Sequence, residues 1–155
     1  MWIWCAPAAF QAWVARYGIT NPVDALLFLF YGFKILQFTV FIGWCYFYGN
    51  GSLMPVGGTL WSLGSGVALI VSGQMLNLSV FHRLGKVGVF YGDKFGYHVP
   101  WCHRFPFSLF KHPQYAGTLL SIWGFFLVMR FPHDDWYLLP LLETGYYALS
   151  AYFER

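Results

Sequence analysis

The feature that most constrains this chain is a long segment, residues 57–81, without Asp, Glu, Lys, Arg or His. At about 1.5 Å per residue, a helix of this length crosses a hydrocarbon core of roughly 30 Å. A second segment, residues 25–48, is nearly as long and carries a single charge, Lys34. The composition agrees, because 58% of the 155 residues are hydrophobic and only 10% are charged, unlike a soluble globular domain. The sequence therefore predicts an integral membrane protein.

The rest of the chain predicts shorter helices around one long loop. Residues 115–129 and 136–153 are apolar and are expected to form a helical hairpin. Residues 1–17 are rich in Trp and carry one charge, which favours an interfacial helix. No repeat or linker divides the chain, so we expect a single domain over residues 1–155. The predicted fold is all-α, a polytopic helical membrane bundle with three to four spans and an interfacial N-terminal helix.

The segment between the spans, residues 82–114, is polar, punctuated by Gly and rich in aromatic side chains. A loop of this length usually carries function. It holds five of the nine Lys and Arg residues, namely Arg83, Lys86, Lys94, Arg104 and Lys111. The positive-inside rule therefore predicts a cytosolic loop. Since the last helix is the return leg of a hairpin, it is expected to bring Glu154 back to this side.

His112 stands directly before Pro113 at the expected start of a helix. Because proline favours the first helical position, His112 should lie at the N-cap, near free backbone N–H groups and the positive end of the helix dipole. Such a terminus suits a carboxylate or phosphate. Tyr115 follows on the first turn, and Gly117 would let a bulky cofactor approach the backbone. Together with Lys111, these residues form a candidate ligand cradle, with a purely structural role for His112 as the alternative.

Aromatic side chains gather in the predicted loop, Tyr91 and Trp101 among them. One interpretation is a belt at the membrane interface. The other is a cage for an onium cation, since aromatic faces attract quaternary ammonium and sulfonium groups. Arg104 and Lys111 are candidates to hold a lipid phosphate. An onium cation joined to a phosphate is found in phospholipid headgroups. The candidate headgroup ligands are therefore Tyr91, Trp101, Arg104 and Lys111.

Polar and small residues interrupt the uncharged span. Gln74 and Asn77 lie one turn apart, and polar groups at this depth are costly unless they meet a partner. They are candidate cofactor contacts, and an interhelical hydrogen bond is the alternative. Gly64 and Gly66 have no strand before them, so close helix packing is favoured over a nucleotide phosphate loop.

Residues 72–117 resemble the phospholipid N-methyltransferase family, most closely its plant and algal phosphatidyl-N-methylethanolamine methyltransferases. The shared motifs occur in order with matching spacing: Leu84-Gly85, the Tyr-Gly-x-x-Phe-Gly run from Tyr91 to Gly96, Val99-Pro100-Trp101, Phe105-Pro106-Phe107 and His112-Pro113-x-Tyr115-x-Gly117. The resemblance covers the chain from about residue 25 to the end. Isoprenylcysteine carboxyl methyltransferases carry a similar His-Pro step, and the resemblance implies a core like theirs.

This resemblance implies methylation, dependent on S-adenosyl-L-methionine, of the amino headgroup of phosphatidyl-N-methylethanolamine or its dimethyl form. The setting would be phosphatidylcholine synthesis in the endoplasmic reticulum membrane. Family members bind the cofactor through a Gly-x-Gly element in a transmembrane helix and a Glu-Glu pair after the last one. Here the second glycine falls on Gly73, with Val71 at the first position. The second glutamate falls on Glu154, with Phe153 before it.

An acceptor amine must lose a proton before it can attack a methyl group, so the reaction needs a base. His112 and Glu154 are the expected catalytic residues. The expected cofactor-binding residues are Gly73, Gln74, Asn77, His112, Tyr115, Gly117 and Glu154, and the expected headgroup ligands are Tyr91, Trp101, Arg104 and Lys111.

The expected partners are a phospholipid substrate and the membrane, with no nucleic acid. No metal site is expected, because the His and Cys spacings match no zinc pattern. Two other functions stay open at this stage, a carboxyl methyltransferase of the isoprenylcysteine type and a non-catalytic membrane lipid-binding protein. The oligomeric state and the number of methylation steps are not determined by the sequence.

Overall fold

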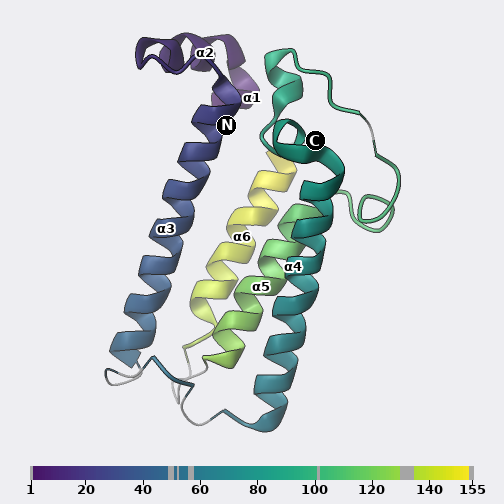
Figure 1. Cartoon of the computed structure of the whole chain (residues 1–155). Helices are drawn as coiled ribbons and strands as arrows, with labels where there is room; N and C mark the ends of the chain where they lie inside the picture. Colours follow the sequence, from purple (N-terminus) through teal and green to yellow (C-terminus); the bar gives the residue numbers. More distant parts are fainter. Residues whose placement is uncertain are drawn as a thin grey trace.

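The computed structural model describes residues 2–48, 51, 53–55, 58–100, 102–129 and 135–153. All regular secondary structure in these residues is helical, which confirms the predicted all-α class. The elements are α1 (Trp2–Cys5), α2 (Pro7–Arg16), α3 (Pro22–Tyr48), α4 (Leu60–Val89), a short 3-10 helix η1 (Gly92–Phe95), α5 (Pro113–Val128) and α6 (Leu138–Phe153). Figure 1 shows the four long helices running along one bundle, with α3 set apart from the other three.

Two helical segments are long and apolar enough to cross a membrane. They are α3 and the stretch Leu60–Phe95, which contains α4. Helices α5 and α6 have 16 residues each, about 24 Å at 1.5 Å per residue. They are therefore shorter than a hydrocarbon core of roughly 30 Å.

One end of the bundle collects most of the chain's polar segments, and we call it the loop end. The start of α3, the end of α4, the start of α5 and the end of α6 lie there, and α2 lies across it (Figure 1). Tyr147 of α6 packs against Tyr115 in the first turn of α5, with ring centroids 5.3 Å apart. The predicted return of the last helix to the side of the loop is therefore confirmed.

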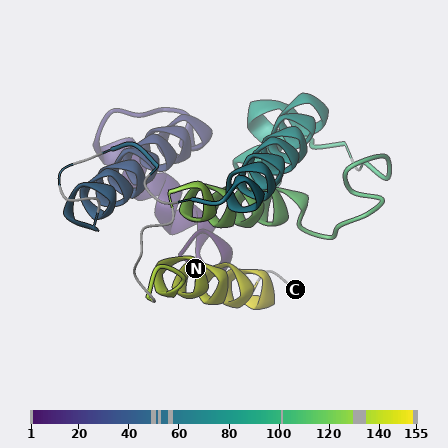
Figure 2. The ribbon, with the colours of Figure 1, turned by 90° about the horizontal axis from the view of Figure 1, so that it is seen from below.

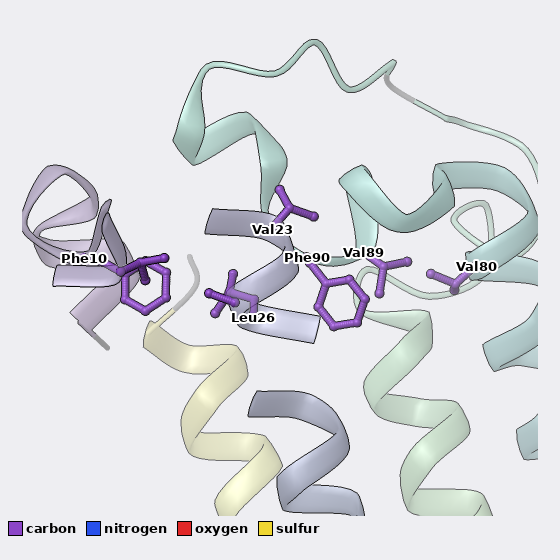
Figure 3. Close-up of a cluster of buried hydrophobic side chains, with 8 residues drawn as sticks. Phe10, Val23, Leu26, Val80, Val89 and Phe90 are labelled. Atoms are coloured by element: carbon purple, nitrogen blue, oxygen red, sulfur yellow. The ribbon is translucent and has the colours of Figure 1, made fainter. Parts of the chain in front are cut away.

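A hydrophobic cluster joins α2, α3 and α4 at the loop end (Figure 3). Phe10 of α2 meets Val23 and Leu26 of α3, and Val89 and Phe90 follow from the end of α4. Full burial of such a side chain stabilises the fold by roughly 1.5–3 kcal/mol. The N-terminal helix is thus tied to the bundle by its apolar face. Its other face leaves aromatic side chains such as Trp13 exposed.

Helix α4 extends past residue 81, where the sequence analysis ended it. His82, Arg83 and Lys86 are helical, and the connecting segment begins only at residue 90. The prediction was wrong because charged residues mark the end of an apolar span but not the end of a helix. This helix continues because its apolar face stays buried, and Val89 is one of the buried residues. Gly85, at a φ of 61°, kinks the helix within this extension.

Helices α4 and α5 are in backbone contact through glycines. A β carbon added to Gly73 would lie 2.4 Å from the carbonyl oxygen of Gly117, and one added to Gly66 would lie 2.9 Å from that of Gly124. Small residues allow this approach between membrane helices, where packing replaces the hydrophobic effect. The predicted close packing is confirmed for Gly66. It is wrong for Gly64, which has nothing within 4 Å of an added β carbon.

Helix α3 meets its neighbours near its two ends. Towards the loop end, Phe30 packs edge-on against Phe90, with centroids 5.5 Å apart. Towards the other end, Phe41 and Trp44 pack on Phe126 of α5, at 5.2 Å and 4.7 Å. Viewed along the bundle in Figure 2, α5 is central and α3, α4 and α6 surround it. Between these two aromatic contacts, the middle of α3 lines a cavity.

The glycine contact predicts a large difference between two substitutions on the same helix. Gly73→Ala should lower the free energy of unfolding by about 1–3 kcal/mol, because its methyl group has no room beside backbone atoms. Gly64→Ala should leave stability unchanged or raise it by up to about 1 kcal/mol, since alanine favours a helix. Denaturation followed by circular dichroism in one detergent measures both. Equal stability of the two variants would contradict the packing.

Candidate functional site

A cavity of about 1110 Å³ lies between α3 and the three other long helices. Ligand pockets commonly measure roughly 300–1,000 Å³, so this one has room for a cofactor and part of a lipid. Its walls are mostly aliphatic and aromatic. The polar side chains that line it are Tyr31, Lys34, Gln37, Gln74, Asn77, Tyr91, Gln114, Tyr115, Thr118, Ser121, Glu143 and Tyr147.

Aromatic side chains converge on Tyr115 towards the loop end of this cavity. The hydroxyl groups of Tyr91 and Tyr115 are 3.1 Å apart and share a hydrogen bond. The Tyr115 ring stacks on the imidazole of His112, with centroids 5.5 Å apart and planes inclined by 13°. Tyr147 of α6 packs on the same ring. Tyr115 thus connects the cavity to His112 at the start of α5.

His112 occupies the position that the sequence predicts, as the N-cap of α5 with Pro113 at the first helical position. Its side chain makes no capping hydrogen bond to the described part of α5. Stacking on Tyr115 instead orients the ring. The side chain is therefore not a hydrogen-bonding cap of α5, while a structural role and a catalytic or cofactor-binding role both stay predictions.

Tyr91 has a backbone conformation that is uncommon for a bulky residue. Its φ of 53° and ψ of 37° place it in the left-handed region, which costs an L-residue roughly 1–2 kcal/mol. The next residue, Gly92, is buried so tightly that an added β carbon would lie 2.3 Å from Val87. Backbone strain of this kind is concentrated at functional sites. Here it accompanies a phenol that lines the cavity.

The two amides of α4 differ in their partners. Gln74 donates through Nε2 to the hydroxyl of Ser121, at 2.9 Å, and Ser121 donates to the carbonyl of Gly117. Gln74 therefore makes the interhelical hydrogen bond that was the alternative to a cofactor contact. Asn77 is different, because its Oδ1 atom is buried and has no hydrogen-bond partner among the described residues.

An unsatisfied buried oxygen costs about 1–3 kcal/mol. The Oδ1 atom of Asn77 is turned towards α5 and would lie 2.6 Å from a β carbon at Gly117. The last torsion of an asparagine side chain is soft, so the amide can turn its oxygen towards the cavity that the residue lines. Asn77 is thus an acceptor that a ligand donor would satisfy.

The remaining predicted residues fall into two groups. Gly73 and Gly117 face each other in the α4–α5 contact, so close helix packing explains why both positions are glycine. A cofactor contact at these positions stays a prediction. Arg104 and Lys111 are exposed on the segment after η1 and are not among the described residues that line the cavity. Trp101 and Glu154 lie outside the described residues.

Eight polar residues that line the cavity are not among the site residues that the sequence predicts: Tyr31, Lys34, Gln37, Gln114, Thr118, Ser121, Glu143 and Tyr147. Lys34 and Glu143 carried a usable signal, because a charged residue within an apolar span is costly and usually functional. Gln37 and Tyr147 carried no such signal. Which residues of an apolar helix face a cavity depends on where the other helices lie.

Comparison with known proteins identifies the family. The sequence profile of the family described as phospholipid methyltransferase matches residues 61–155. The chain belongs to the phospholipid methyltransferase family. The matched region contains α4 from its second residue, all of α5 and α6, and the candidate site residues Asn77, Tyr91, His112 and Tyr115. The resemblance found in the sequence is confirmed.

Three relatives in this family illustrate the similarity. Phosphatidyl-N-methylethanolamine N-methyltransferase from Arabidopsis thaliana is 43% identical over 35% of the chain. Phosphatidylethanolamine N-methyltransferase from Rattus norvegicus is 34% identical over 58%, and phosphatidyl-N-methylethanolamine N-methyltransferase from Saccharomyces cerevisiae is 42% identical over 38%. The chain spans 33%, 45% and 29% of the length of these relatives. No solved structure matches it significantly.

The unsatisfied oxygen of Asn77 predicts opposite effects for two similar substitutions on α4. Asn77→Leu should raise the free energy of unfolding of the ligand-free protein by about 1–3 kcal/mol, because it removes a buried acceptor without a partner. Gln74→Leu should lower it by about 0.6 kcal/mol, the usual strength of an interhelical hydrogen bond in a membrane protein. Thermal denaturation without ligand measures both, and a destabilised Asn77→Leu protein would refute the assignment.

Proposed function

We propose that this protein transfers a methyl group from S-adenosyl-L-methionine to the amino headgroup of phosphatidyl-N-methylethanolamine or its dimethyl form. Membership of the phospholipid methyltransferase family and the names of the relatives support this proposal. The observation that carries it is the cavity. Tyr115, which belongs to the His-Pro-x-Tyr-x-Gly motif shared with the family, lines the cavity together with aliphatic side chains that suit an acyl chain.

The residues at the loop end of the cavity fit the methyl donor. The rings of Tyr91 and Tyr115 offer faces that attract a sulfonium cation, and the oxygen of Asn77 would accept a hydrogen bond from an amino or hydroxyl group of the cofactor. Glu154 joins this set through the family resemblance alone. When bound, the cofactor supplies an electrophilic methyl group.

The protein's own residues would then prepare the acceptor. A histidine ordinarily exchanges protons near neutral pH, and His112 stacks on Tyr115, which lines the cavity. We assign His112 the proton that the ammonium headgroup releases, which leaves an amine with a free lone pair. The apolar walls exclude water, and holding the two reacting groups in line is worth on the order of 7 kcal/mol.

The proposed setting is the endoplasmic reticulum membrane, with α3 to α6 embedded in it and the loop end on the cytosolic side. This orientation follows from the positive-inside rule. The basic residues at the loop end include Arg16 of α2, Arg83 and Lys86 of α4, Lys94 of η1, and Arg104 and Lys111 of the following segment. The proposed core resembles that of the isoprenylcysteine methyltransferases, which share the His-Pro step.

The activity can be tested with purified protein in detergent and S-adenosyl-L-methionine carrying a labelled methyl group. We expect label in phosphatidyl-N-methylethanolamine and none in farnesylcysteine, because the acceptor is an amine and not a carboxylate. Calorimetry with S-adenosylhomocysteine should show binding, which a non-catalytic lipid-binding protein would lack. Two results would refute the proposed function: label in farnesylcysteine alone, or no binding of S-adenosylhomocysteine.

The role of His112 can be tested in the same assay. His112→Ala should lower kcat by about 100-fold or more, the usual contribution of a general base, and Glu154→Ala should weaken cofactor binding. His98→Ala is the matched control, because His98 is an exposed histidine of the same connecting segment, and it should retain full activity. Full activity of His112→Ala would remove this residue from the mechanism.

A further inference from the structure

Two opposite charges lie in the middle of the helices that surround the cavity. Apart from Asp24 in the first turn of α3 and the basic residues near the end of α4, the Lys, Arg, Asp and Glu residues of α3 to α6 are Lys34 and Glu143. A charge near the centre of a membrane helix costs roughly 2.5–3.5 kcal/mol. Both side chains line the same cavity, Lys34 from α3 and Glu143 from α6.

Gln37 connects these two charges across the cavity. Lys34 donates through Nζ to Oε1 of Gln37 at 3.0 Å, and Gln37 donates through Nε2 to Oε1 of Glu143 at 3.3 Å. Lys34 and Glu143 make no ion pair with each other in the described part of the chain. One amide therefore separates a cation from an anion, and each keeps bonding capacity for a further partner.

A purely structural tie between α3 and α6 would not need these charges. The hydrogen bond from Gln37 to Glu143 is long, and two neutral amides would make the same bond without the cost of two charges at membrane depth. Aromatic contacts already hold α3 near both of its ends. The charges are therefore better explained by a ligand that carries both signs.

We propose that Lys34, Gln37 and Glu143 form a receptor for a zwitterionic headgroup in which a phosphate and an ammonium group are joined by a short linker. Lys34 binds the phosphate and Glu143 binds the ammonium group, while Gln37 keeps the two charges apart. This inference rests on the proposed function, because such a headgroup is that of the proposed acceptor lipid. It adds a subsite that binds the headgroup through both charges.

The position of the receptor agrees with the rest of the cavity. Glu143 lies one turn from Tyr147 on α6, and Tyr147 packs on Tyr115. Tyr147, Thr118 and Gln37 all line the cavity. Polar groups therefore continue from the receptor to Tyr115, and the aliphatic walls favour a lipid over a free phosphate compound of the same headgroup.

The test measures binding without cofactor, by calorimetry of the purified full chain in detergent. The probes are dihexanoyl phosphatidyl-N-methylethanolamine, dihexanoyl phosphatidic acid, which lacks the amine, and phospho-N-methylethanolamine, which lacks the acyl chains. Glu143→Gln keeps an acceptor for Gln37 but loses the charge. We expect it to weaken binding of the first probe by about 10-fold or more, the usual value of a charged hydrogen bond, and to leave phosphatidic acid unaffected.

Lys34→Gln provides an independent variant, which should weaken binding of both lipid probes. Asp135→Asn is the matched control, because it removes an exposed carboxylate just before α6, and it should bind like the wild type. The free headgroup compound should bind more weakly than the lipid, and equal or tighter binding would identify a soluble ligand and overturn the lipid assignment. Unchanged binding of the first probe to Glu143→Gln or to Lys34→Gln would overturn the receptor.

These outcomes are distinct from failure of the proposed function. Binding that depends on Glu143 and Lys34, in a wild-type protein that transfers no methyl group, would refute the methyltransferase and leave the receptor standing. Methyl transfer by the wild type, together with unchanged lipid binding by Glu143→Gln, would refute the receptor and leave the methyltransferase standing.

Discussion

The backbone contact between α4 and α5 is the interaction on which the rest of the structure depends. It exists because Gly66 and Gly73 meet Gly124 and Gly117, so that the two helices approach without intervening side chains. The contact fixes the height of α5 against α4 and places Asn77 of one helix beside the first turn of the other. A shift of one residue along either helix would put a side chain where a glycine must be, so the register is sharply defined.

The cavity follows from the opposite kind of packing. Helix α3 meets its neighbours through large rings near its ends, Phe30 on Phe90 and Trp44 on Phe126. These rings keep the two backbones apart, and the middle of α3 cannot reach α5. The space left there holds Lys34 and Glu143, which would be costly in contact with lipid. Close packing on one side of α5 and spaced packing on the other thus produce a rigid wall and an adjoining cavity.

The two proposed sets of residues lie at different depths in this cavity and would serve the same reaction. Towards the loop end, Tyr115 and His112 provide aromatic faces and a group able to exchange a proton, as a reaction between a sulfonium donor and an amine requires. Deeper in the bundle, Lys34 and Glu143 provide two fixed charges of opposite sign. An acceptor lipid that carries both charges would bind first at the second set, and its amino group would then move to the first set for the reaction.

The sequence alone was sufficient to predict helices, apolar spans, the start of α5 at Pro113 and the family, because each of these depends on local composition or on a motif of fixed spacing. It did not reveal that α4 continues to Val89 or that Gly73 and Gly117 face each other, because both depend on surfaces supplied by other helices. The same limit applies to Gln37 and Tyr147, whose role depends on which side of an apolar helix looks into the cavity. Only the tertiary structure decides that side, since the rotation of a helix about its axis is set by its neighbours.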